Sequence, residues 1–277
     1  MKRVSILILL LVVACVAGVV RSYSKRGVSL SQLPSVMSGD SDSKGEAREE
    51  IRKSYELSPG ARVEISGING AVRVDAVDGN TAEIYIERTG RSPEALSRRK
   101  VSIQNSSNSL TIRGEKGDAG FFARLFGSNP SERVTLKLPK QVSLFAKRIN
   151  GAVNVGELEG AVKVYGVNGK VDIAQAAGSA DFKGINGDIS VGLKDIDNEG
   201  VRIEGVNGNI DLRLNQGLNA DLEAHGMNGT VISEARDVTV EKTTHGSYYA
   251  HVGSGGNPIS AKGINGNIRL SRPGGNG

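Results

Sequence analysis

Apolar and polar residues alternate in short segments that recur along most of the chain. In the segment after Asn186, Ile189 and Val191 are apolar and Ser190 between them is polar. Apolar residues at every second position predict half-buried β-strands, and β-branched residues suit the pleated surface of such strands. Seven segments of this kind follow an Asn-Gly step: Asn69-Gly70, Asn150-Gly151, Asn168-Gly169, Asn186-Gly187, Asn207-Gly208, Asn228-Gly229 and Asn265-Gly266.

The Asn-Gly steps recur at a nearly constant spacing. From Asn150 onward the intervals are 18, 18, 21, 21 and 37 residues. The last interval is about twice the others, and His245–Tyr248 is interpreted as a worn copy inside it. A period near 20 residues is typical of a repeat architecture, in which neighbouring units stabilise one another.

Two all-β architectures fit this repeat. Asn-Gly between alternating strands favours a tight hairpin, and hence an antiparallel β-meander. Alternatively, each 18–21 residues form one coil of a β-helix-like solenoid, with stacked turns whose Asn side chains form a ladder of hydrogen bonds. A second Gly two residues before most Asn, as at Gly184, adds a corner that a hairpin does not need. This favours the solenoid.

The N-terminus has the pattern of an export signal. Lys2 and Arg3 precede an apolar run from Val4 to Val20, which contains the single Cys of the chain, Cys15. Val12–Cys15 is similar to the lipobox of bacterial lipoproteins, which makes Cys15 a lipidation candidate. The apolar run continues beyond Cys15, so an uncleaved membrane anchor and an ordinary cleaved signal stay open. All three predict an exported chain, membrane-anchored in the first two cases.

The net charge of +5 does not indicate a nucleic-acid binder. Five basic residues before Gly27 account for all of it, and the remainder has 30 basic and 30 acidic residues. Basic residues around an apolar run are a membrane-flanking feature. We therefore expect a membrane partner through the N-terminus and no nucleic acid.

The pattern divides the chain into four parts. Residues 1–20 are the leader or anchor, 21–53 a flexible tether in which Glu46–Tyr55 could form a brief helical turn, and 273–277 a disordered tail. The β-solenoid domain spans 54–272, irregular over 54–145 and regular over 146–272. Ser92–Lys100 has a more helical composition.

An aromatic cluster interrupts the irregular part. It consists of Phe121, Phe122, Arg124, Leu125 and Phe126, bounded by Gly and Pro. Such a loop could contact a membrane, a wall polymer or a protein partner. It could equally fold back and cap one end of the solenoid.

These repeats resemble a known family. Ser58–Val63 running into Ile68–Val74, then Leu136–Pro139, then successive Gly-Ile-Asn-Gly copies, look like the bacterial "putative adhesin" family DUF4097. The chain is similar also to the related head GIN domain (DUF2807). The resemblance implies an exported, right-handed β-helix-like solenoid of the cell envelope. It implies no established activity and supplies no catalytic residues.

Few residues suggest chemistry. Asp172 and Asp181 could share an outward face, as the carboxylates of a polysaccharide-cleaving β-helix enzyme would. His225, His245 and His251 lack a metal-ligand motif around them, although the last two could share a strand face. Calcium-binding nonapeptide repeats need Asp where this chain has Ile or Val. We expect no cofactor and no metal.

The sequence therefore predicts a non-enzymatic, membrane-anchored envelope protein that binds a polymer, a lipid or another envelope protein. An envelope-stress sensing or regulatory module acting on a membrane partner, and a degenerate carbohydrate-active enzyme, are the alternatives.

Overall fold

The computed structural model describes residues 47–117, 130–243 and 246–272. These residues form two long sheets and one short helix. The elements in chain order are β1 (Ala47–Glu56), β2 (Arg62–Ser66), β3 (Val72–Val77), β4 (Thr81–Gly90), α2 (Pro93–Ser97), β5 (Arg99–Ser106), β6 (Ser109–Lys116), β7 (Ser131–Pro139), β8 (Ser143–Ile149), β9 (Val153–Leu158), β10 (Val162–Asn168), β11 (Val171–Ala177), β12 (Ala180–Asn186), β13 (Ile189–Asp195), β14 (Val201–Asn207), β15 (Ile210–Leu214), β16 (Ala220–His225), β17 (Val231–Ser233), β18 (Val238–Lys242), β19 (Tyr248–Val252), β20 (Asn257–Asn265) and β21 (Ile268–Ser271).

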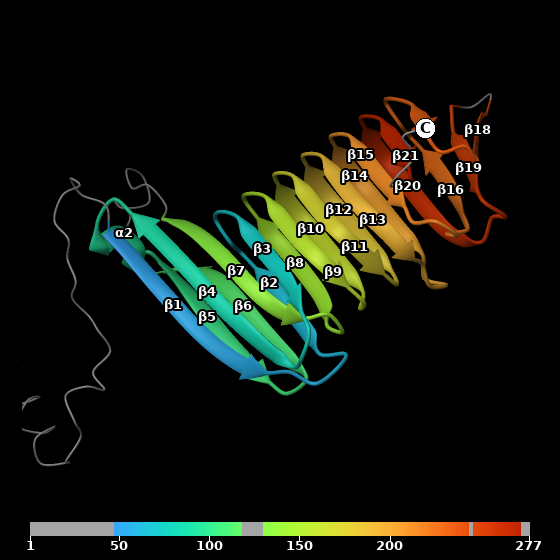
Figure 1. Ribbon diagram of the computed structural model, residues 1–277. Coiled ribbons are helices and arrows are strands. Elements are labelled where there is room, and N and C mark those ends of the chain that lie inside the picture. The colour runs from blue at the N-terminus through green and yellow to red at the C-terminus, as the bar shows by residue number, and fades with distance from the viewer. Residues whose placement is uncertain (1–46, 118–129, 244–245, 273–277) are drawn as a thin grey trace, which may run out of the picture. The chain divides into compact units, whose positions relative to one another are not determined.

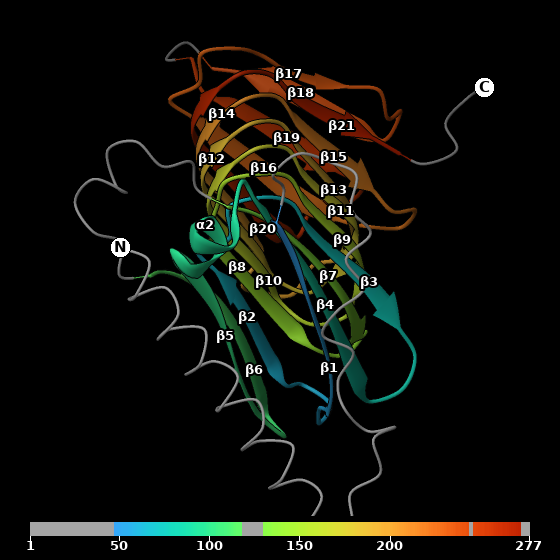
Figure 2. The same cartoon turned by 90° about the vertical axis from the view of Figure 1, so that its left-hand side faces the viewer.

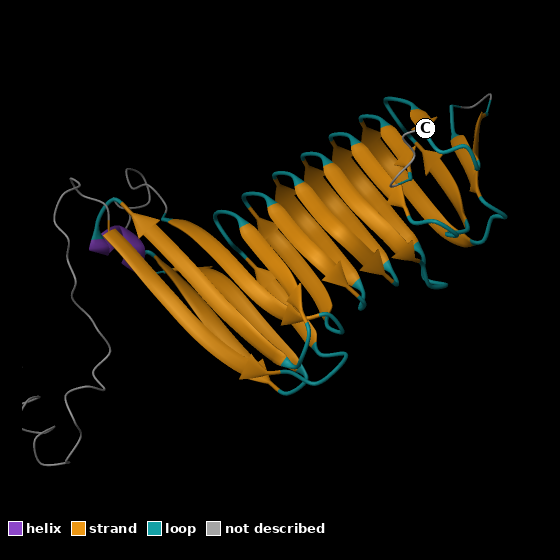
Figure 3. Cartoon of the chain, viewed as in Figure 1, coloured by secondary structure: helices purple, strands orange, loops and turns teal. Residues whose placement is uncertain are grey.

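The strands belong to two sheets, here named sheet A and sheet B. Sheet A has the order β1-β4-β7-β3-β9-β11-β13-β15-β21-β17, and sheet B has the order β18-β19-β16-β20-β14-β12-β10-β8-β2-β6-β5. In the regular part, successive strands alternate between the sheets (Figures 1 and 3). Figure 2 views the same coils from the end that carries α2.

Each coil consists of one strand in each sheet. β10 runs in sheet B, the turn at Asn168 leads into β11 in sheet A, and a second turn returns the chain to β12 in sheet B. Within each sheet these strands pair in parallel, with Val162 opposite Ala180 and Val171 opposite Ile189. Parallel pairing between successive coils confirms the predicted solenoid. The alternative antiparallel meander is wrong for the repeats.

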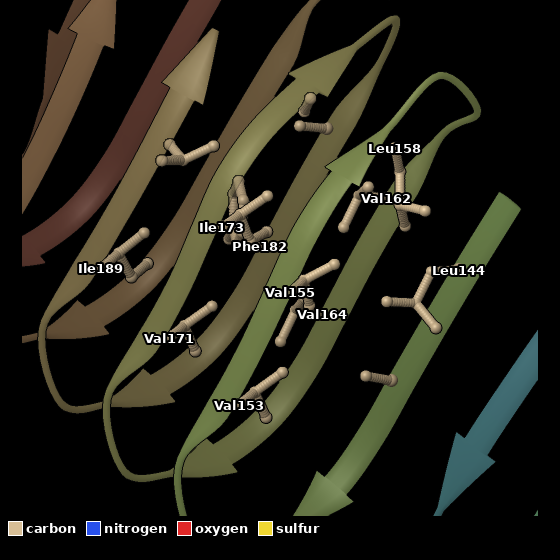
Figure 4. Packing of buried hydrophobic residues seen from close by; sticks show 14 of the residues in the cluster. Leu144, Val153, Val155, Leu158, Val162, Val164, Val171, Ile173, Phe182 and Ile189 are labelled. Atoms are coloured by element: carbon tan, nitrogen blue, oxygen red, sulfur yellow. The ribbon is translucent and has the colours of Figure 1, made fainter. Parts of the chain in front are cut away.

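The core lies between the two sheets. Val164 of β10 and Ile173 of β11 are fully buried, whereas their neighbours Lys163 and Ala174 are exposed. Figure 4 shows the inward side chains of successive coils, among them Val155, Val164 and Ile173. The described core, from Leu57 to Leu270, lies entirely within the compact unit 45–277. Burial therefore scales with the number of stacked coils, and we expect this unit to fold by itself.

The Gly two residues before most of the repeat Asn residues turns one extra apolar residue inward. Gly166 has φ +62°, and the parallel register passes from Tyr165 to Val167 without it, as at a β-bulge. Val164 and Val167 are consequently both buried, although they are three positions apart and a regular strand would place them on opposite faces. In one coil the equivalent residue is Arg148, at φ +54° the single non-glycine residue with positive φ in the described part of the chain.

The Asn side chains of neighbouring coils are hydrogen-bonded at four steps. Asn150 Nδ2 donates to Asn69 Oδ1 (2.9 Å), and Asn207 Nδ2 donates to Asn186 Oδ1 (3.0 Å). Asn265 Nδ2 donates to Asn207 Oδ1 (2.9 Å), and Asn228 Nδ2 donates to Asn265 Oδ1 (3.0 Å). These are bonds of the predicted ladder.

The last two coils do not stack in chain order. β20 lies between β14 and β16, and β21 lies between β15 and β17. After β15 the chain skips one position in each sheet and forms β16 and β17 one position further along. It then returns, and β20 and β21 occupy the skipped positions. This insertion explains the 37-residue interval. The predicted worn copy at His245–Tyr248 is wrong, because Gly246 and Ser247 lie between antiparallel strands β18 and β19.

The N-terminal end differs from the sequence prediction in its first strand. β1 pairs antiparallel with β4 over ten residues, so the helical turn expected at Glu46–Tyr55 is wrong and residues 47–53 are not part of a tether. Ile51 and Tyr55 are four residues apart, a spacing that also suits a helix, but both pack against the core in the strand. Tertiary pairing overrides the local pattern here. The helical segment is present as α2, which Ser92 caps.

Candidate functional site

The outward face of sheet A is electrostatically balanced in its central strands. Three Arg point outward there, and each meets an Asp. The pairs are Arg73–Asp75 (2.9 Å), Arg213–Asp172 (3.4 Å) and Arg269–Asp211 (2.9 Å). The same strands also expose Glu157, Lys194 and Asp195, so sheet A presents a face with no excess of positive charge over strands β3 to β21.

The outward face of sheet B is basic over the corresponding strands. From β2 through β20, six basic and three acidic side chains occupy the alternating outward positions, and Arg148 is exposed as well. The basic residues are Arg62, Lys147, Lys163, Lys183, Arg202 and Lys262, and the acidic residues are Glu64, Asp181 and Glu204. Charges that balance in the sequence are thus unequally distributed between the two faces.

Two contacts on this face involve carboxylates. Lys147 Nζ lies 2.9 Å from Glu64 Oε1, and the hydrogen bond from Lys147 is the main reason that the pKa of Glu64 lies below its usual value. Lys183 Nζ donates to Glu204 Oε2 (2.9 Å), which likewise lowers the pKa of Glu204. Both carboxylates are therefore ionised at neutral pH.

Two aromatic residues occupy the same face. The rings of Phe145 and Tyr165 meet edge to face with centroids 5.1 Å apart, and Lys147 Nζ lies 4.9 Å from the Phe145 ring centroid. Tyr165 Oη donates to Asp181. Burial, then the hydrogen bond to Asp181, raises the pKa of Tyr165 to about 12. Both rings are half-buried, and Arg62 and Lys147 lie against the Phe145 ring.

A histidine cluster lies at the C-terminal end of sheet B. His225 Nδ1 lies 2.8 Å from Ser247 Oγ, and His225 Nε2 lies 2.7 Å from Glu223 Oε1. Tyr249 Oη also donates to Glu223 (3.0 Å). Sequence reasoning missed this grouping, because the strand pairing of β16 with β19 creates it.

The cluster has the residue types of a Ser-His-Glu triad but lacks features that acyl transfer needs. The side chains of His225 and Glu223 are 41% and 50% exposed, so solvent screens their interaction. The Ser247 N–H donates to Thr243 Oγ1 (3.2 Å) and is therefore engaged rather than open to an oxyanion. The cluster is better explained as an attachment of the β18–β19 hairpin.

A buried ionic network closes the N-terminal end. Arg99 Nε donates to Glu132 Oε1 (3.1 Å), and the Asn69 N–H donates to Glu132 Oε2 (3.0 Å). The Glu132 side chain is fully buried and that of Arg99 is 11% exposed. Arg99 also donates to the Gly67 carbonyl. This network fixes the first Asn-Gly turn to β5 and β7.

The predicted carboxylate pair does not form. Asp172 lies on β11 of sheet A and Asp181 on β12 of sheet B, so their side chains face opposite sides of the molecule. Asp172 meets Arg213, and Asp181 accepts from Tyr165. The prediction of a shared face is wrong, because consecutive strands alternate between sheets.

Other predicted residues occupy different places. Cys15, His245 and the aromatic cluster Phe121, Phe122, Arg124, Leu125 and Phe126 lie outside the described residues. His251 lies on β19 and meets Asp221. Within the described ranges, no three His, Cys, Asp or Glu side chains are grouped as metal ligands. No helix of the described part has the length and apolarity that a membrane span requires.

The fold and the sequence together define a β-solenoid repeat domain. Residues 156–271, from β9 to the end of β21, match the family model described as Toastrack DUF4097. This match confirms the resemblance to DUF4097 over this segment. A comparison with curated proteins found no match.

Three solved structures match this chain at low sequence identity. A "putative cell adhesion protein" from Clostridium sporogenes ATCC 15579 is 10% identical, covering 82% of this chain and 100% of its own, with a TM-score of 0.42. A "putative adhesin" from Bacteroides fragilis NCTC 9343 is 12% identical, covering 80% and 97%, with a TM-score of 0.32. Another "putative adhesin", from Parabacteroides distasonis ATCC 8503, is 12% identical, covering 81% and 97%, with a TM-score of 0.28. Likenesses this distant do not define a function.

Proposed function

We propose that this chain is a non-enzymatic binding or scaffold module of the bacterial cell envelope, held at the membrane by its N-terminal segment. The observation that carries the proposal is the construction of the solenoid, in which rigid parallel strands present continuous polar faces. The carboxylate pair that the sequence suggested for an enzyme, Asp172 and Asp181, lies on opposite sheets. A regular face suits a repetitive ligand, since each coil offers an equivalent row of side chains.

The N-terminal leader supports the proposed location at the membrane of the cell envelope. The charged start, the apolar run and Cys15 favour export followed by anchoring, either through a lipid or through the apolar run itself. In both cases the solenoid is displayed outside the cytoplasm, where wall polymers, lipids and other envelope proteins are its possible partners. The aromatic cluster at 121–126 is a candidate contact loop of the same module.

Co-sedimentation tests this proposal. Residues 45–277, which contain the whole described core, are mixed with purified cell wall and, separately, with liposomes. We expect specific retention by one of them without turnover of polysaccharide. The same unit lacking 120–128 is run beside it, and loss of retention with unchanged thermal stability would assign the contact to the aromatic cluster. Robust cleavage of a polysaccharide by residues 45–277 would overturn the proposal.

A further inference from the structure

The basic face of sheet B has a regular arrangement of cations. Each of five neighbouring strands, in the spatial order β8, β10, β12, β14 and β20, carries one cation at an alternating outward position: Lys147, Lys163, Lys183, Arg202 and Lys262. β8 also exposes Arg148, at the position where the other strands have the bulge Gly. The register places these residues alternately in two rows. Lys163 is opposite Phe145 and Asp181, whereas Lys183 is opposite Tyr165 and Glu204. The cations therefore form a zigzag along the solenoid axis.

Most of this positive charge is not neutralised. Within these five strands, Asp181 and Glu204 are the outward acids among the described residues. Lys163, Arg202 and Lys262 form no salt bridge in the described part of the chain, and all three are exposed. On sheet A, by contrast, every central outward Arg meets an Asp. Desolvating paired ions is unfavourable, so sheet B is the face able to gain from an anionic ligand.

The spacing of the cations defines the shape of the ligand. Neighbouring strands lie about 4.8 Å apart, so five strands place their charges along roughly 19 Å. The zigzag crosses strands from different coils and continues in one direction, which matches an extended chain with repeating negative charges. Phe145 and Tyr165 lie among the cations, and half-buried aromatic rings suit the flat face of a sugar ring.

We propose that the outward face of sheet B, from β8 to β20, binds an anionic linear carbohydrate polymer lying along the solenoid axis. This rests on the proposed function and names its ligand class. A bilayer is the less suitable partner, because a membrane-surface site needs exposed apolar side chains beside its cations. The large exposed apolar side chains of the described residues are Ile232 and Tyr249, on β17 and β19, outside this face.

The test compares two triple variants of residues 45–277. One is Lys163→Gln, Arg202→Gln and Lys262→Gln, which removes three exposed cations of the face that form no salt bridge in the described part of the chain. The matched control is Lys170→Gln, Lys194→Gln and Arg236→Gln, which removes the same charge from exposed positions elsewhere. A third variant, Lys163→Arg with Lys262→Arg, retains the charge. Thermal melts establish that all three fold.

The probes are polygalacturonate as a polymer of anionic sugars, inorganic polyphosphate, neutral dextran, and vesicles of phosphatidylcholine with or without phosphatidylglycerol. We expect polygalacturonate to bind and dextran not to bind. The sheet B variant should weaken polygalacturonate binding at least about tenfold and lower the slope of log K against log salt by roughly 2 to 3, because each missing cation releases about one ion less. The control and the charge-retaining variant should bind like the parent protein.

Five outcomes would overturn the proposal. Equal binding by the sheet B variant and the control would do so, as would tighter binding of polyphosphate than of the sugar polymer, because the rings would then serve no purpose. Preference for anionic vesicles would assign the face to lipid headgroups. If the sheet B variant is retained by cell wall as well as the parent protein, the binding-module function stands and only this face is rejected. If the parent protein binds neither cell wall nor vesicles, both the proposed function and this face are rejected.

Discussion

Substituting Gly187 by Val tests the tight stacking of the coils most directly. Gly187 follows Asn186 and has φ +153°, a conformation that side chains with a Cβ rarely adopt. A Cβ built there would lie 2.4 Å from the carbonyl oxygen and 2.6 Å from the carbonyl carbon of Gly169 in the neighbouring coil. These are backbone atoms, so no side-chain rotation can relieve the overlap.

The magnitude follows from two terms. Forcing a non-glycine residue into a sparsely populated backbone region costs of order 1–3 kcal/mol. The collision also shifts the backbone, which weakens the hydrogen bonds from Gly187 N to Asn207 O (3.0 Å) and from Gly169 N to Asn186 O (3.0 Å), at about 0.5–1.5 kcal/mol each. We therefore expect Gly187→Val to lower the free energy of unfolding by about 2–6 kcal/mol.

Urea and thermal denaturation of residues 45–277, followed by circular dichroism, measure this loss. The matched control is Gly217→Val, because Gly217 also has positive φ (+81°) but a Cβ there would meet no atom within 4 Å. The control carries the backbone strain without the collision and should lose less stability than Gly187→Val. An unchanged melting curve for Gly187→Val would refute the reasoning, and equal losses in both variants would refute the part assigned to coil contact.

Three further predictions use the same assays or a titration. Arg148→Gly should raise the free energy of unfolding by about 1 kcal/mol, because Arg148 has φ +54° where the other coils have Gly; no gain in the urea midpoint would contradict this. Glu132→Ala should lower it by about 3–5 kcal/mol, since Arg99 would keep its charge in a buried site without its partner, and a loss below about 1 kcal/mol would show that the site admits water. Tyr165 should ionise near pH 12: its folded pKa lies above the usual 10.0, so its contribution to stability is complete below pH 10 and is lost as the pH rises through about 12. Ultraviolet titration of tyrosinate should therefore lose a high-pH component in Tyr165→Phe, and should show that component at lower pH in Asp181→Asn.

The repeat itself was readable in the sequence because its causes are local. Alternating apolar residues such as Ile189 and Val191 predict strands by their period, and the recurring Asn-Gly step predicts where each strand begins. The interval of 18–21 residues is long enough for two strands and two turns. The Gly two residues before most Asn correctly favoured the solenoid, but the corner expected at Gly184 is wrong, because this residue forms a bulge within β12. The stacking of equivalent turns then makes hydrogen bonds between Asn side chains possible.

The elements that the sequence predicted wrongly share one cause, which is pairing between distant segments. Nothing in the residues of β1 excludes a helical turn, and ten-residue pairing with β4 decides its structure. Likewise, the 37-residue interval could indicate a missing copy, but the chain instead forms a hairpin and inserts β20 between β14 and β16. Pairing partners distant in sequence are chosen by the fit of whole surfaces, which local pattern does not encode.

The distribution of charge shows most clearly what the sequence determines and what only the tertiary structure decides. The sequence determined that the part of the chain from Gly27 onward has equal numbers of acidic and basic residues, 30 of each. Only the tertiary structure decided how they are distributed, because alternate strands enter different sheets and neighbouring coils bring Lys163, Lys183 and Arg202 into one face while Arg213 and Asp172 neutralise each other on the other. Electrostatic interactions depend on distance in space, so a balanced composition can produce one neutral face and one basic face.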